Sequence, residues 1–231
     1  MQIDDKKLRE KQEYFREVFK KRLGVPDRYF EVDKDIIDKY QGVLPDELLL
    51  YWKEYGFSSF KEGFFWLTNP DEYTELVKRY LEGTTFEDRI NLYVVARNAF
   101  GELYLWESKK GGTLDIKSFS NMIFFSADAD RENYTKEEEN FKMVSFLGTK
   151  NPKYLNEEDA SGKPLFERAL KKLGKLEPDE MYGYKLSHFL GGKESITNLT
   201  KMNLFNHYEI QKELKAPTIS VSDMENNTVT Y

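Results

Sequence analysis

The chain has 231 residues and a mass of 27.4 kDa, which is enough for one large domain or two small ones. Aromatic residues make up 15% of it, which argues against a disordered chain. The net charge of −6 argues against direct nucleic-acid binding, because phosphate neutralisation needs a basic surface. The lack of cysteine excludes disulfides, thiolate metal sites and cysteine nucleophiles. With no secretory signal and no apolar run of membrane-spanning length, we expect a cytoplasmic protein without membrane contact.

The first part of the chain carries three helical patterns, in which apolar residues recur every three or four positions. The first covers residues 4–22, and the second begins at Pro45 and ends at Gly56. The third begins at Asn69, which can cap the helix and is followed by a proline suited to a first turn. The aromatic segment 57–66 is interpreted as a loop entering a short strand, with its rings in the core rather than in a cofactor site.

Four strands are predicted in the middle of the chain, over residues 91–96, 102–106, 113–117 and 121–125. A turn that ends in Gly101 separates the first two, and a second turn with two glycines precedes the third. Because short turns connect successive strands, we expect an antiparallel meander.

Helices return in the last part of the chain. One is predicted through Phe141 and Leu147, another over residues 163–173 and a last one over residues 207–214. The tail from Thr218 is rich in Ser, Thr and Asn and is expected to be frayed. Together these elements predict an α+β protein with a central antiparallel sheet flanked by helices, either as two abutting subdomains or as one continuous unit.

The stretch Glu180–Lys201 combines a turn of acidic, aromatic and glycine residues with a Gly-Gly pair. The sequence from Gly191 to Ser195 superficially resembles a phosphate-binding loop. However, Ser187 stands where that motif needs a glycine, and no hydroxyl residue directly follows Lys193. We therefore interpret the glycines as backbone positions of a turn, with a binding patch as the second interpretation.

Metal and catalytic sites have little support. His188 and His207 are the only histidines, and both are interpreted as packed or surface residues. The segment Asp128–Glu139 partly matches a calcium loop, but Asn133 stands at the position that needs glycine. A solvated acidic loop is favoured, and a patch that steers a basic protein partner is the alternative. No cofactor is expected.

Two sets of residues resemble known families. Runs at 44–49, 56–57, 63–67, 69–73 and 96–101 resemble a GAD-like domain. Runs at 165–174, 179–184, 190–192 and 198–201 are similar to the C-terminal domain of type VI secretion DNase-immunity proteins. The resemblance divides the chain into an N-terminal helix 1–22, a GAD-like domain 23–125, a connection 126–162, an immunity-family C-terminal domain 163–217 and a polar tail 218–231.

The resemblance implies an immunity protein, which binds and inactivates a cognate toxin, expected to be a DNase, without catalysing a reaction. It also marks family-motif positions that are either structural or partner-binding. These are Phe100, Gly101, Glu180, Tyr182, Gly183, Gly191, Gly192 and Lys201. The alternative hypothesis is a ligand- or nucleotide-binding regulator, or an enzyme, with a deep polar pocket near Glu180–His188.

Overall fold

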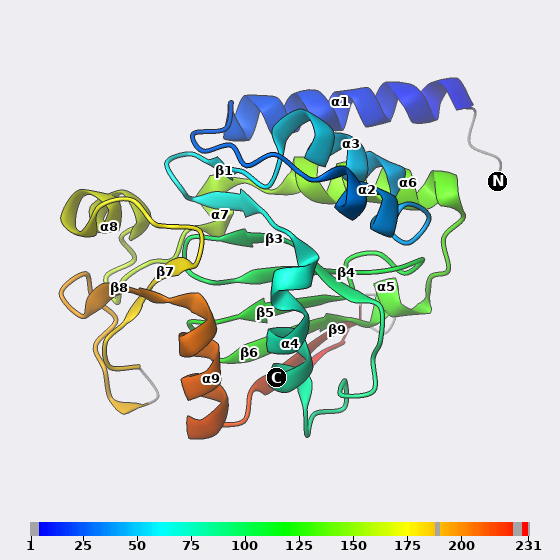
Figure 1. Ribbon diagram of the computed structural model, residues 1–231. Helices are drawn as coiled ribbons and strands as arrows, with labels where there is room; N and C mark the ends of the chain where they lie inside the picture. Colours follow the sequence, from blue (N-terminus) through cyan, green and yellow to red (C-terminus); the bar gives the residue numbers. More distant parts are fainter. Residues whose placement is uncertain (1–4, 188–189, 224–227, 231) are drawn as a thin grey trace.

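The computed structural model describes residues 5–187, 190–223 and 228–230 (Figure 1). Its helices are α1 (Asp5–Leu23), α2 (Lys34–Tyr40), α3 (Asp46–Tyr55), α4 (Pro70–Leu81), α5 (Ala127–Arg131), α6 (Lys136–Thr149), α7 (Pro152–Leu155), α8 (Phe166–Leu173) and α9 (Leu204–Leu214). Its strands are β1 (Ser59–Phe60), β2 (Phe65–Leu67), β3 (Leu92–Asn98), β4 (Leu103–Glu107), β5 (Leu114–Lys117), β6 (Met122–Ser126), β7 (Glu180–Tyr184), β8 (Leu199–Asn203), β9 (Thr218–Asp223) and β10 (Thr228–Thr230).

An eight-stranded sheet in the order β1-β2-β3-β4-β5-β6-β9-β10 forms the centre of the molecule, and β7 and β8 pair as a separate small sheet. The predicted strands β3 to β6 form the expected antiparallel meander. Only β6 and β9 pair in parallel within the described sheet. The α+β class predicted from the sequence is therefore confirmed.

Alternation along the strands sends side chains into two separate cores. On β4, Tyr104 and Trp106 belong to the core under α1, α3 and α6, whereas Leu103 and Leu105 belong to the core under α4 and α9. The sheet therefore has a helical layer on each face, with α4 and α9 in front of it in the view of Figure 1.

The helix over residues 70–81 begins as its sequence indicates. The Asn69 side chain accepts a hydrogen bond from the Asp71 N–H at 3.1 Å, and Pro70 occupies the first turn. The helices predicted at 4–22 and after Pro45 are also present, as α1 and α3. Two others differ at their start, because α8 begins three residues later than predicted and α9 three residues earlier.

The prediction of a frayed tail is wrong for residues 218–223. These residues form β9, which pairs in parallel with β6 from Thr218 opposite Met122 onward. Ile219 packs against the core under α4 and α9, and Ser220 is buried. The partner strand lies about a hundred residues earlier in the chain, so local composition could not reveal this pairing.

Several further elements were not predicted, among them α2, α7, β7 and β8. The helix α2 follows Asp33, which does not hydrogen-bond the helix through its side chain. The turn predicted around Glu180 is instead β7, and it pairs antiparallel with β8, with Glu180 opposite Asn203 and Tyr184 opposite Leu199. The stretch Glu180–Lys201 is thus two strands joined by a long connection, of which residues 188–189 are outside the described part.

Candidate functional site

The turn between β3 and β4 contacts two elements from the last quarter of the chain, β7 and α9. The Tyr182 N–H on β7 donates to the Ala99 carbonyl at 2.8 Å. The Tyr208 hydroxyl on α9 donates to the Gly101 carbonyl at 2.5 Å. Both tyrosines are buried, so these bonds form away from water and fix β7 and α9 against the turn. We call this contact region the joint.

One buried amide holds the turn in shape. The Asn98 side-chain oxygen accepts the N–H groups of Phe100 and Glu102, each at 3.0 Å. The Asn98 side-chain nitrogen donates to the Leu155 carbonyl at 3.2 Å. The Phe100 ring is buried and packs against Phe119 and Tyr182, with centroid distances of 5.2 and 6.2 Å.

Two glycines at the joint leave room for methionine side chains. Gly101 has φ +77°, and a Cβ there would lie 2.6 Å from Met181 Sδ. A Cβ on Gly183 would lie 2.6 Å from Met202 Sδ. The positive φ of Gly101 favours glycine, and at both positions a side chain would require the neighbouring methionine to move.

The Gly-Gly pair lies outside the joint, in the connection between β7 and β8. Gly191 has φ +87°, and a Cβ there would meet no atom within 4 Å, so backbone conformation alone requires glycine. A Cβ on Gly192 would collide with the Leu186 carbonyl oxygen, and the Gly192 N–H donates to the Ser187 carbonyl at 2.9 Å. The pair therefore closes a compact loop.

Glu180, Tyr182 and Lys201 on β7 and β8 make hydrogen bonds within the chain. Glu180 accepts a hydrogen bond from the Lys201 ammonium at 2.9 Å, and Lys201 also donates to the Lys175 carbonyl at 3.1 Å. The Tyr182 hydroxyl donates to the Gly174 carbonyl at 2.6 Å, and burial raises the pKa of Tyr182 to about 12. These contacts hold the two strands against the end of α8.

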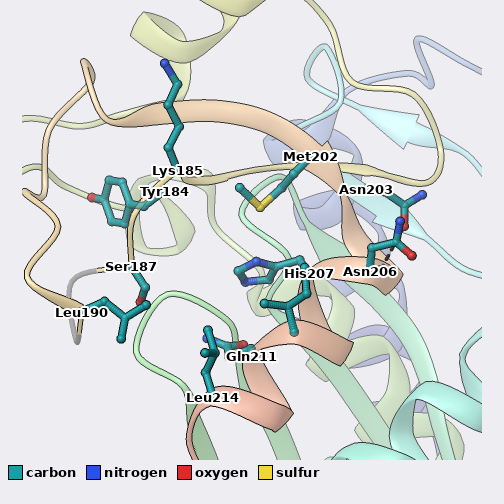
Figure 2. A pocket seen from close by; sticks show the side chains of 11 residues that line it. Tyr184, Lys185, Ser187, Leu190, Met202, Asn203, Asn206, His207, Gln211 and Leu214 are labelled. Carbon is teal, nitrogen blue, oxygen red and sulfur yellow. Dashed lines mark hydrogen bonds between the residues drawn. The ribbon is translucent and has the colours of Figure 1, made fainter.

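An apolar groove lies beside the joint, between α9, β8 and the segment that follows β7. It encloses about 260 Å³, and Figure 2 shows the His207 ring central among the lining side chains. Three large apolar side chains at the groove are exposed to solvent by about half: Leu190 by 49%, Ile210 by 58% and Leu214 by 53%. Clustered exposed apolar side chains around a recess are typical of a surface that binds another molecule.

The floor of the groove is polar but poorly suited to catalysis. His207 Nε2 lies 2.8 Å from the Ser118 hydroxyl, and burial lowers the pKa of His207 to about 4, so the ring is neutral at pH 7. Ser118 itself is buried, and among the described residues no carboxylate orients the histidine as in a catalytic triad. Gln211 donates to the Ser118 carbonyl at 2.6 Å, while its buried Oε1 has no partner among the described residues.

The polar pocket of the alternative hypothesis would involve Glu180, Tyr182 and His188. Glu180 and Tyr182 do not line the groove, whose wall is mainly apolar, and His188 lies outside the described residues. His207, which the sequence suggested as an ordinary packed residue, is instead the central residue of the groove floor. Nothing in its local sequence indicated this position.

The segment Asp128–Glu139, predicted as a loop, instead contains most of α5 and the first turn of α6, and its acids form ion pairs within the chain. Asp130 lies 2.8 Å from Arg89, which holds the pKa of that carboxyl below its usual range. Arg131 pairs with Asp128 at 2.7 Å and with Asp223 at 2.8 Å. No group of three or more potential metal ligands occurs in the part of the chain that the structure describes. None of the helices described there has the length and apolar content needed to cross a membrane.

Two family models match successive parts of the chain. Residues 14–120 match the GAD-like domain family, and residues 140–215 match the family described as T6SS immunity protein Tdi1, C-terminal. The chain therefore carries a GAD-like domain followed by a Tdi1 C-terminal domain, as the resemblance of its sequence predicted. No curated protein matches the chain.

A solved structure has the same fold. The crystal structure of Atu4351 from Agrobacterium tumefaciens superposes with a TM-score of 0.79, over 93% of this chain and 96% of that chain, at 21% sequence identity. The arrangement of sheets and helices is thus a recurrent fold, which spans both family-matched parts.

Proposed function

We propose that this chain is an immunity protein, which neutralises a cognate toxin by stoichiometric binding and catalyses no reaction. The match of residues 140–215 to the Tdi1 C-terminal family carries the proposal. The net charge of −6 supports a nuclease as the toxin, because a protein that binds DNA needs a basic surface and is attracted by an acidic partner.

We further propose that the apolar groove contacts the toxin. Protein interfaces obtain much of their affinity from a few large side chains that fill desolvated recesses. The groove offers such a recess, with half-exposed Ile210 and Leu214 on one wall and neutral His207 at the floor. An apolar side chain of the toxin would bury these surfaces and remove them from water.

The experiment uses the toxin encoded beside this chain's gene, with DNA cleavage as the readout. Increasing amounts of the purified chain are added to a fixed amount of toxin. We expect cleavage to stop at a fixed molar ratio that does not change with incubation time, and a complex of the same ratio in size-exclusion chromatography with light scattering. An inhibitory ratio that falls with time would indicate catalysis, and the absence of both complex and protection of producing cells would contradict the proposal.

The groove is tested with Ile210→Glu, and Leu50→Glu on α3 is the matched control, because Leu50 is also exposed by 49%. We expect Ile210→Glu to weaken toxin binding at least tenfold, since a buried charge in the interface is costly, while Leu50→Glu leaves binding unchanged. Equal effects of the two substitutions, or none, would remove the groove from the interface without affecting the proposal of immunity.

A further inference from the structure

A second cavity, of about 300 Å³, lies between the start of α4, β2 and the segment that joins α1 to α2. Four aromatic residues contribute to its wall, namely Phe30, Phe57, Trp66 and Tyr73. Phe30 is 43% exposed and so presents an aromatic ring to solvent at the cavity. We call this recess the acidic cavity, because three carboxylates also line it.

Three carboxylates line the cavity without a paired cation among the described residues. Glu31, Asp33 and Glu72 line the cavity and are exposed, and none has an ion-pair partner among the described residues. The two lysines of α2 pair with other acids, Asp38 and Asp71. Desolvation of its carboxylate raises the pKa of Glu72, and the nearby positive charge of Arg97 offsets this only in part.

One buried arginine completes the wall. Arg97 has no exposed surface, stacks on the Trp66 ring at 4.5 Å and donates to the Pro178 carbonyl at 2.7 Å. Its Nε has no acceptor among the described residues. With three carboxylates and one guanidinium, the ionisable groups of the wall sum to −2 when all are charged. The wall therefore carries more negative than positive charge, and Arg97 is its one cation among the described residues.

We propose that the acidic cavity receives an arginine side chain of the toxin. The guanidinium lies among Glu31, Asp33 and Glu72 and against the exposed Phe30 ring, since arginine combines carboxylate pairing with stacking on aromatic faces. The inference deepens the proposed function and rests on it, because a DNA-cleaving toxin carries basic side chains on its DNA-binding surface.

The acidic cavity and the groove adjoin, so one partner can reach both. Pro178 lines the cavity, and Asn203 lines the groove. Asp179, next to Pro178, accepts a hydrogen bond from the Asn203 side chain at 2.9 Å and one from the Leu204 N–H at 2.8 Å. Figure 1 shows α4 and α9, which border the two recesses, on the same face of the large sheet. The surface over α4 and α9 thus offers an apolar anchor site beside an acidic one.

The cavity is tested first without the toxin, with acetyl-arginine methylamide as the probe and acetyl-citrulline methylamide as its neutral control. The indole N–H signal of Trp66 in NMR is the readout, and those of Trp52 and Trp106 are internal references, because they lie outside the cavity. We expect a saturable shift of the Trp66 signal with the arginine probe alone, and its loss in Glu31→Gln/Glu72→Gln. No shift, or an equal shift with the citrulline probe or in the variant, would overturn the inference.

The second test measures toxin binding at several salt concentrations. We expect Glu31→Gln/Glu72→Gln to weaken binding about tenfold, chiefly through slower association, and to reduce its salt dependence. The control Glu10→Gln/Glu137→Gln makes the same charge change at exposed residues of α1 and α6 and should bind like wild type. If wild type binds the toxin and the cavity variant binds equally well, the inference is wrong. If wild type does not bind the toxin, the proposed function fails, and the arginine-probe experiment still tests the cavity.

Discussion

Gly101 illustrates how one residue sets the geometry of the joint. Its φ of +77° and its closeness to Met181 both exclude a side chain, whereas Gly42 has the same φ but open space around it. We expect Gly101→Ala to lower the free energy of unfolding by about 3 kcal/mol and Gly42→Ala by about 1 kcal/mol, since only the first adds a steric clash to backbone strain. Urea unfolding measures both; equal losses would show that Met181 moves aside without cost.

His207 links the stability of the groove to pH. Its folded pKa of about 4 lies below the unfolded value near 6.5, so the unfolded state binds the proton more tightly. Its contribution is therefore fully present above about pH 6.5 and is lost as the pH falls towards 4. Between pH 7.5 and pH 5, wild type should lose about 2 kcal/mol more than His207→Gln, whose amide can still reach Ser118. Parallel pH profiles in urea unfolding would contradict this.

At the scale of elements, β9 shows that the end of the chain is part of the sheet. Its pairing with β6 places Ile219 on the core and continues the hydrogen-bonded rows of the meander. Deleting residues 218–231 should lower the free energy of unfolding by about 3 kcal/mol, because β6 becomes an open edge and its apolar face is exposed.

A deletion of residues 224–231 is the control for that experiment, because it leaves β9 in place. It should cost less than about 1 kcal/mol, as expected for the loss of a short edge strand. If both deletions cost the same, the pairing of β6 with β9 contributes little to stability.

At the scale of the whole molecule, we propose that the two family-matched parts unfold as one cooperative unit. The joint connects them through Tyr182 and Tyr208, and α6 packs on α1 and α3 although it lies mostly in the second part. All three tryptophans lie in residues 14–120, so their fluorescence reports on the first part alone. Hydrogen exchange of β7 and β8 amides reports on the second part.

The two probes should give the same free energy of unfolding. Tyr208→Phe removes the hydrogen bond to Gly101 and should lower both values together by about 1 kcal/mol. A lower value for the β7 and β8 amides, with fluorescence unchanged, would show that the second part opens on its own and that the joint is weak.

Much of the fold could be predicted because its signals are local. The helix α4 has its cap, its proline and its apolar stripe within a dozen residues, and the meander β3 to β6 has short turns between strongly apolar strands. The strands β7 and β9 carry weaker patterns and pair with segments that are distant or separated by a long connection, so no window of sequence contained both partners.

By itself, the sequence determined the α+β class, the locally capped helices, the meander and the resemblance of two segments to known families. Only the tertiary structure decided what the motif residues contact, where β9 pairs and that His207 forms the floor of a groove. It also brought Glu31, Glu72 and Pro178 around one cavity. The physical reason is that caps and periodicity act between neighbours in the chain, whereas a recess is made by side chains from segments that meet only after the core has formed.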